Sequence, residues 1–105
     1  MAIIKINFSD LGGPAYIGRE KGKNARKKLN IDMLEDGDNT FIIIIPDDTY
    51  SINSSYFLGL FGESVKKSAS IDAFFNKFDF KMPERMIVKI QDYVSRALHE
   101  GGPLI

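Results

Sequence analysis

The sequence predicts an α/β fold, and three observations lead to this prediction. A continuous run of aromatic and β-branched residues, F-I-I-I-I at 41–45, is typical of a buried parallel strand. From Ser54 onward the apolar residues recur every three or four positions, as in an amphipathic helix. Strand and helix signals alternate along the chain in the order strand, helix, strand, helix, short strand, helix. We therefore expect a small β-sheet of about four strands with helices packed on it, in βαβαβα order.

The first half of the chain begins with a strand over residues 2–8, in which alternate apolar side chains share one side: Ile4, Ile6 and Phe8. Residues 9–23 are rich in glycine and charge and indicate a loop. Asn24 is a suitable N-cap for a helix over 25–33, whose apolar positions are four residues apart.

The run at 41–45 contains no polar residue, so we expect it to be a central parallel strand that is buried on both faces. The P-D-D turn of Pro46, Asp47 and Asp48 ends it. Burying each large apolar side chain contributes roughly 1.5 to 3 kcal/mol, so this strand is expected to dominate the core.

In the second half, the helix that starts at Ser54 has one apolar face: Phe57, Leu60, Phe61, Ser64 and Val65. A short helical turn is expected over 71–76, with Ser70 as its cap. Alternation over 78–81 indicates a short edge strand. A last helix, opened by a proline, is expected over about 83–101.

The composition indicates one small domain that spans residues 1–105. The chain has no cysteine, which excludes thiol catalysis, disulfide bonds and cysteine-ligated zinc. Its formal net charge is +0, which argues against a general nucleic-acid binder and is compatible with a homodimer.

The chain contains no apolar run near the roughly 18 to 20 residues that span a bilayer. Its first residues, M-A-I-I-K-I-N-F, are too few and too alternating for a signal peptide. We therefore expect a cytoplasmic protein without a membrane partner.

Two segments carry a resemblance to a known family: T-F-I-I-I-I-P-D-D-T-Y-S-I-N-S-S-Y-F-L-G-L-F-G-E-S-V-K-K at 40–67, and G-G-P-A-Y-I-G-R-E-K-G-K-N-A-R-K-K-L at 12–29. With them the chain resembles the STAS-like family of small bacterial domains with no settled function. It is more distantly similar to the STAS domains of anti-sigma-factor antagonists, in which an apolar strand leads to a D-S-S-G-type turn and a helix. The resemblance covers about residues 3–80.

The resemblance implies a regulatory protein-interaction module. In such antagonists a serine at the helix start is phosphorylated by a histidine-kinase-like ATPase, and only the unphosphorylated form binds that partner. The matching turn is Asn53, Ser54, Ser55 and Tyr56, so Ser54 and the adjacent Ser55 are the phosphorylation candidates. The turn departs from the family pattern by having Asn53 for the acidic residue and Tyr56 for the glycine. A side chain as large as Tyr56 can obstruct access to Ser54.

The start of a helix is also physically suited to a phosphate, because its free N–H groups and dipole favour negative charge. The alternative interpretation of the serine pair is structural. Ser54 or Ser55 then serves only as an N-cap, which contributes about 1 kcal/mol.

A second candidate site is the basic segment 19–28, with six cationic residues: Arg19, Lys21, Lys23, Arg26, Lys27 and Lys28. It allows an alternative function, a small protein that binds a phosphate-bearing ligand or nucleic acid, with Gly18 and Gly22 admitting backbone close to the ligand. The zero net charge and the absence of a nucleic-acid motif favour a solvated face instead.

Catalysis has little support in the sequence. Asp47 and Asp48 follow a strand end, where carboxylates can bind Mg²⁺, but a P-D-D-T turn accounts for them. His99 is the single histidine and falls at a helix end, and no G-x-S-x-G motif is present. We expect a non-catalytic protein without metal or cofactor.

Two further features indicate tight packing. Gly59 and Gly62 fall on one helix and predict a close approach of the sheet or of another subunit. Phe74 and Phe75 are adjacent, so a helix cannot bury both against one surface. One of them is therefore expected to face a second element or a partner.

Overall fold

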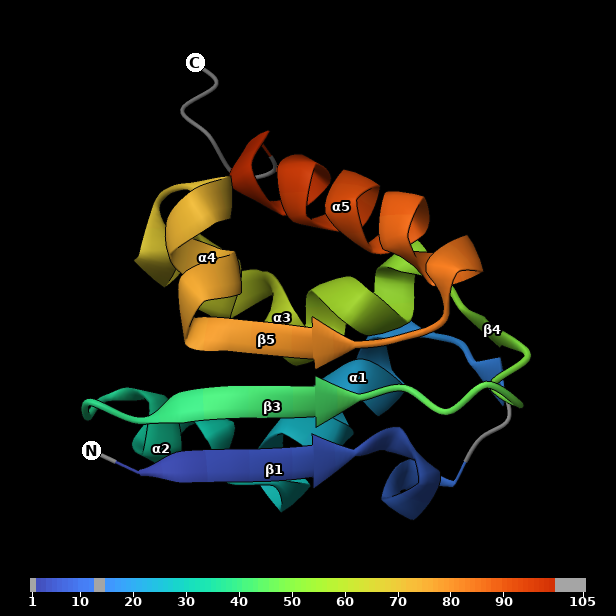
Figure 1. The fold of residues 1–105 in the computed structure, drawn as a ribbon, viewed down its shortest axis with the longest axis horizontal. Coiled ribbons are helices and arrows are strands. Elements are labelled where there is room, and N and C mark those ends of the chain that lie inside the picture. The colour runs from blue at the N-terminus through green and yellow to red at the C-terminus, as the bar shows by residue number, and fades with distance from the viewer. Residues whose placement is uncertain (1, 13–14, 100–105) are drawn as a thin grey trace.

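The computed structural model describes residues 2–12 and 15–99, and Figure 1 shows an α/β arrangement. Three parallel strands form the larger sheet in the order β1-β3-β5: β1 (Ile3–Asn7), β3 (Thr40–Ile44) and β5 (Phe78–Lys81). The predictions of a central parallel strand at 41–45 and of an edge strand at 78–81 are confirmed.

Two further strands pair with each other and not with this sheet: β2 (Ala15–Tyr16) and β4 (Ser51–Ile52). The expected single sheet of about four strands is therefore replaced by a three-stranded sheet and a two-stranded parallel pair. Because β2 and β4 are each two residues long, no period-2 pattern marks them in the sequence.

Five α-helices lie in the described residues: α1 (Arg19–Lys28), α2 (Ile31–Glu35), α3 (Ser54–Ser68), α4 (Ile71–Lys77) and α5 (Glu84–His99). A 3₁₀ helix, η1 (Phe8–Leu11), follows β1. In Figure 1, α1, α2 and α3 lie behind the larger sheet, while α4 and α5 lie above β5. Over residues 2–12 and 15–99, no helix combines the length and the apolar character that crossing a bilayer requires.

Within residues 2–12 and 15–99, helices cover only one face of the larger sheet. Along β3, Phe41 and Ile43 are fully buried, whereas Ile42 and Ile44 are half-buried. None of the helices in this described part of the chain crosses the sheet face that is turned to the viewer in Figure 1. The expectation that the 41–45 run is buried on both faces is wrong, because an uninterrupted apolar run looks the same whether one or both faces are covered.

The covered face packs on a cluster of aromatic rings. Phe78 stacks on Phe41 and on Phe74, with ring centroids 4.6 and 4.9 Å apart. Phe61 of α3 meets Phe78 edge to face at 5.5 Å. Phe74 is fully buried and Phe75 only half-buried, so the helix does divide its two adjacent rings between different environments.

The first helix differs from its prediction. It begins at Arg19, inside the expected loop 9–23, and ends at Lys28, so Asn24 is an interior residue and not an N-cap. Gly18 precedes the helix with a φ of 104°, a conformation that favours glycine. Asn30, with a φ of 58°, separates α1 from α2 within the predicted helix 25–33.

The C-terminal elements agree with their predictions. The Ser70 side chain accepts a hydrogen bond from the Ala73 amide at 3.1 Å and caps α4. Helix α5 begins at Glu84, directly after Pro83, and is described as far as His99. The predicted end near residue 101 lies outside the described residues.

Candidate interaction surface

The starts of α1 and α3 lie side by side, because the paired strands β2 and β4 lead into them. The Asn53 backbone amide donates to the Tyr16 carbonyl at 3.0 Å, which adds one hydrogen bond to the β2–β4 pairing. The Asn53 side-chain Oδ1 then accepts from the Tyr56 amide at 2.9 Å and from the Gly18 amide at 3.4 Å. One side chain therefore caps α3 and also bonds to the residue that precedes α1.

The two helices approach each other through glycine. A Cβ atom at Gly22 would clash with the carbonyl oxygen of Tyr56, and one at Gly59 would clash with that of Arg19. Close packing is the correct reason for Gly59, whose neighbour is α1, but not for Gly62, whose Cβ would meet only the Leu58 Cβ at 3.9 Å. Gly22 is thus a helix-packing residue, and the interpretation that it admits backbone to a ligand is wrong.

The serine pair occupies the first turn of α3. Ser54 and Ser55 are half-buried, and within the described residues neither hydroxyl makes a hydrogen bond. Asn53 is the N-cap, so the interpretation of either serine as the cap is wrong. The large Tyr56 side chain is 4% exposed and packs inward, which leaves the serines unobstructed from that side.

A cavity of about 360 Å³ lies beside this turn, and we call it the tyrosine pocket. Its lining residues come from η1, β2, the residue that follows each of them, α1 and α3: Leu11, Gly12, Ala15, Tyr16, Ile17, Lys21, Asn24, Ala25, Lys28 and Tyr56. The Tyr16 hydroxyl donates to the Phe8 carbonyl at 2.6 Å. Burial, with a smaller effect of the adjacent Tyr16, raises the pKa of Tyr56 to about 12.

A second hollow, of about 270 Å³, runs between α1 and α3, and we call it the basic groove. Its lining combines five cations with two carboxylates, two glycines and a leucine: Arg19, Lys23, Arg26, Lys27, Asp32, Glu63, Gly59, Gly62, Leu58 and Lys66. Ser55 precedes Leu58 and Gly59 by three and four residues, so the helical period places it on the groove side of α3. The corresponding neighbours of Ser54 are the buried Phe57 and the groove residue Leu58, so Ser54 lies nearer the core side of α3 than Ser55 does.

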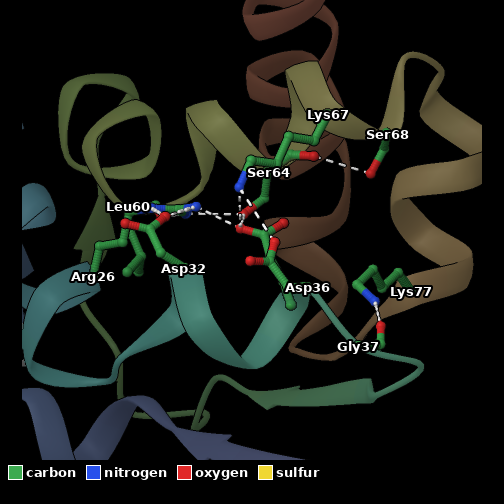
Figure 2. Close-up of polar contacts among 10 residues, drawn as sticks. Arg26, Asp32, Asp36, Gly37, Leu60, Ser64, Lys67, Ser68 and Lys77 are labelled. Carbon is green, nitrogen blue, oxygen red and sulfur yellow. Dashed lines mark hydrogen bonds and ion pairs between the residues drawn. The ribbon is translucent and has the colours of Figure 1, made fainter.

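Arg26 is a structural residue. It is 6% exposed, and its guanidinium bonds to the Glu35 carboxylate, to the Leu60 carbonyl at 2.8 Å and to the Ser64 hydroxyl at 2.8 Å. It also forms an ion pair with the exposed Asp32 at 2.7 Å. Figure 2 shows this network between α1, α2 and α3. The structure thus removes Arg26 from the candidate anion-binding set.

The remaining cations of the basic segment do not form one stripe. Lys21 and Lys28 line the tyrosine pocket, whereas Arg19, Lys23 and Lys27 line the basic groove. The buried residues of α1 lie between the two sets: Gly22, Ala25 and Arg26. Helical geometry therefore divides the five remaining cations into two separate groups.

The candidate catalytic groups remain apart. Asp47 and Asp48 are exposed in the turn after β3, and His99 is exposed at the end of α5, with its Nδ1 2.8 Å from the Ser95 carbonyl. Among the described residues, no three acidic or histidine side chains gather closely enough to hold a metal ion.

Sequence reasoning missed the residues that complete this surface. Glu35 and Ser64 bind Arg26 across 9 and 38 positions of the sequence, and Lys66 adds a cation to the basic groove from α3. One local signal was present. Asn53 precedes the helical period directly, and asparagine is among the best N-cap residues.

Comparison with known protein families, with curated proteins and with solved structures finds no match to this chain. The structure itself defines the class, an α/β protein with a small parallel sheet. The STAS-like resemblance remains a prediction from the sequence.

Proposed function

We propose that this protein is a non-catalytic regulatory module that binds an acidic segment of a protein partner where α1 and α3 begin, with Ser55 as the switch. The observation that supports it most is the double hydrogen bond of Asn53, to Gly18 and to Tyr56. It joins the serine pair and the basic segment, which are separate in the sequence, into one surface.

The charge of this surface supports an acidic partner. Four cations line the basic groove besides the internally bonded Arg26: Arg19, Lys23, Lys27 and Lys66. The amino-terminal ends of two helices add positive potential at the same edge. An acidic peptide gains charge-assisted hydrogen bonds there, at a surface that the carboxylates of Asp32 and Glu63 only partly neutralise.

Phosphorylation of Ser55 would oppose that binding. A phosphate adds about −1.5 to −2 charges and three acceptor oxygens, and the first turn of α3 stabilises both. Because Ser55 is on the groove side, the phosphate would compete with the partner for the same cations. Ser54 is the less favourable position, since its face of the helix leads to Phe57 and the core.

The sequence resemblance supports the same direction of switching. In the STAS-type antagonists the unphosphorylated form binds its partner, and the kinase is a histidine-kinase-like ATPase. An enzyme of that class is the partner and kinase we expect here, in a bacterial cytoplasm.

Capture of partners from lysate of the native host tests this function, with wild type, Ser55→Ala and Ser55→Asp as baits. Ser9→Asp is the matched control, because Ser9 is exposed on η1, away from the groove. We expect wild type, Ser55→Ala and Ser9→Asp to retain one protein that Ser55→Asp loses, and some recovered wild type to carry one phosphate. Equal capture by all four baits without phosphate would contradict the proposal.

A second candidate function rests on the tyrosine pocket. Lys21, Asn24 and Lys28 bring two cations and an amide to a cavity of about 360 Å³, which suits a small phosphate-bearing ligand better than nucleic acid. A nucleotide series assayed by thermal shift tests it. A ligand of this pocket should lose affinity in Lys28→Ala and keep it in Lys27→Ala, whose side chain lines the basic groove.

A further inference from the structure

The open face of the three-stranded sheet is unusual for parallel strands. Parallel sheets are normally covered on both faces, whereas here one face presents half-buried isoleucines of β3 and the 66% exposed Ile3. We define the open face by its outward residues: Ile3, Lys5, Asn7, Thr40, Ile42, Ile44, Asp79 and Lys81. It is apolar along its middle strand and charged on its outer strands.

The strand register arranges these charges in a particular way. Lys5, Ile42 and Asp79 are partners in one row across the sheet, so a cation and an anion flank the central isoleucine. Asn7, Ile44 and Lys81 form the next row. The Lys81 Nζ lies 3.3 Å from the Asp79 Oδ2, and the side chains of Asp79 and Lys81 are 51% and 63% exposed.

We propose that the open face binds a second copy of this chain, in a symmetric dimer whose two-fold axis runs parallel to β3. A turn about this axis places β1 of one copy over β5 of the other and leaves β3 over β3. Lys5 then meets Asp79 of the other copy on both sides, and Ile42 packs on Ile42 between these two ion pairs.

The charges also exclude the other simple two-fold arrangement. An axis across the strands at Ile42 would bring Lys5 over Lys5 and Asp79 over Asp79, which like-charge repulsion disfavours. The chosen axis keeps the strands of the two sheets nearly aligned, as in sandwiches whose sheets pack about 10 Å apart. An isologous contact of this kind closes at two copies and does not propagate.

The size of the face sets the expected strength. Three strands of about five residues cover roughly 240 Å² of flat area, against about 800 Å² per partner in a standard interface. The dimer is therefore weak and depends on concentration. Since α1 and α3 lie on the opposite side of the sheet (Figure 1), both interaction surfaces stay accessible in the dimer.

Analytical ultracentrifugation of the purified chain, from about 10 μM to about 1 mM, tests this dimer through charge reversal. In the row of Lys5, Ile42 and Asp79, Lys5→Asp makes two anions meet wherever position 5 of one copy lies over position 79 of the other. Asp79→Lys makes two cations meet at the same places. Each variant alone should raise the dimer dissociation constant at least about tenfold. An equimolar mixture should recover dimers, because each variant complements the other. The double variant, with both charges exchanged, should recover them as well.

Lys89→Asp is the control, because Lys89 is exposed on α5 and outside the open face. It should associate like wild type, and circular dichroism should show that all variants are folded. A wild type that stays monomeric throughout would overturn the proposal and leave the face to another partner. Dimers that survive both single reversals, or a mixture that stays monomeric, would also overturn it.

Discussion

Gly22 of α1 and Gly59 of α3 lie where the two helices touch: a Cβ atom at Gly22 would lie 3.1 Å from the Gly59 Cα, and a Cβ atom at either glycine would run into the backbone of the opposite helix. A Cβ atom at Gly22 would lie 2.9 Å from the Leu60 amide nitrogen, and one at Gly59 would lie 3.0 Å from that of Lys23. Both contacts involve backbone, which cannot rotate away as a flexible side chain can. The interaction surface depends on this approach, because it brings the basic residues of α1 next to the start of α3.

Gly22→Ala and Gly59→Ala should each lower the free energy of unfolding by about 1 to 2 kcal/mol. Overpacking costs about 1 to 3 kcal/mol and exceeds the gain of about 1 kcal/mol in helix propensity. Gly62→Ala is the matched control, since its Cβ would meet only the Leu58 Cβ at 3.9 Å, and it should be neutral or stabilising. Urea unfolding measures all three, and equal effects at the three positions would contradict the packing account.

Asn53→Ala should cost about 1 to 2 kcal/mol, because it removes the α3 cap and the bond to the Gly18 amide. Ser54→Ala and Ser55→Ala should change stability by less than about 0.5 kcal/mol, since neither serine is the cap. Thermal unfolding of the three variants distinguishes them. A large loss of stability in a serine variant and none in Asn53→Ala would show that a serine, and not Asn53, is the N-cap of α3.

Glu35→Gln should destabilise the protein by about 3 kcal/mol, because it leaves the buried Arg26 guanidinium without its buried counter-charge. Asp32→Asn should cost less than about 1 kcal/mol, since Asp32 is 73% exposed and solvent screens its ion pair. Chemical denaturation checks both. Equal losses would show that the exposed pair matters as much as the buried one.

Stability should fall as the pH rises from about 10 to about 12. The folded Tyr56 keeps its proton up to a pKa of about 12, whereas the unfolded side chain loses it near 10. In this window the unfolded state binds fewer protons, so on the order of 2 to 3 kcal/mol of stability is lost by about pH 12. Tyr56→Phe should show a shallower decline, and an unchanged pH profile would contradict the raised pKa.

The sequence predicts the elements that carry a strong local pattern. The apolar run at 41–45, the cap at Ser70 and the alternation at 78–81 each determine an element through neighbouring residues, and the structure has all three. The start of α1 was missed because Gly18 offers no capping side chain and Gly22 is a poor helix former. Only the contact with Gly59, 37 positions away, explains why a glycine belongs inside that helix.

The candidate site was predicted in pieces for the same reason. Sequence spacing identifies the serine pair and the basic run, but their proximity comes from the β2–β4 pairing, which has no sequence signature. Sequence spacing also cannot show that Arg26, unlike the other cations of the basic segment, is a buried structural residue. Glu35, the partner of Arg26, lies in α2, and Asn30 separates α2 from α1. Only the tertiary structure therefore shows that the Arg26 guanidinium is buried and bonded internally.

The most direct measurement is the affinity of the captured partner for this protein with and without phosphoserine installed at position 55, by isothermal titration calorimetry at two salt concentrations. A regulatory surface at the basic groove predicts binding at least about tenfold weaker for the phosphorylated form, and salt-dependent binding for the unmodified form. Phosphoserine at position 9 should leave the affinity unchanged. Equal affinities for the unmodified protein and the protein phosphorylated at position 55 would contradict the central claim.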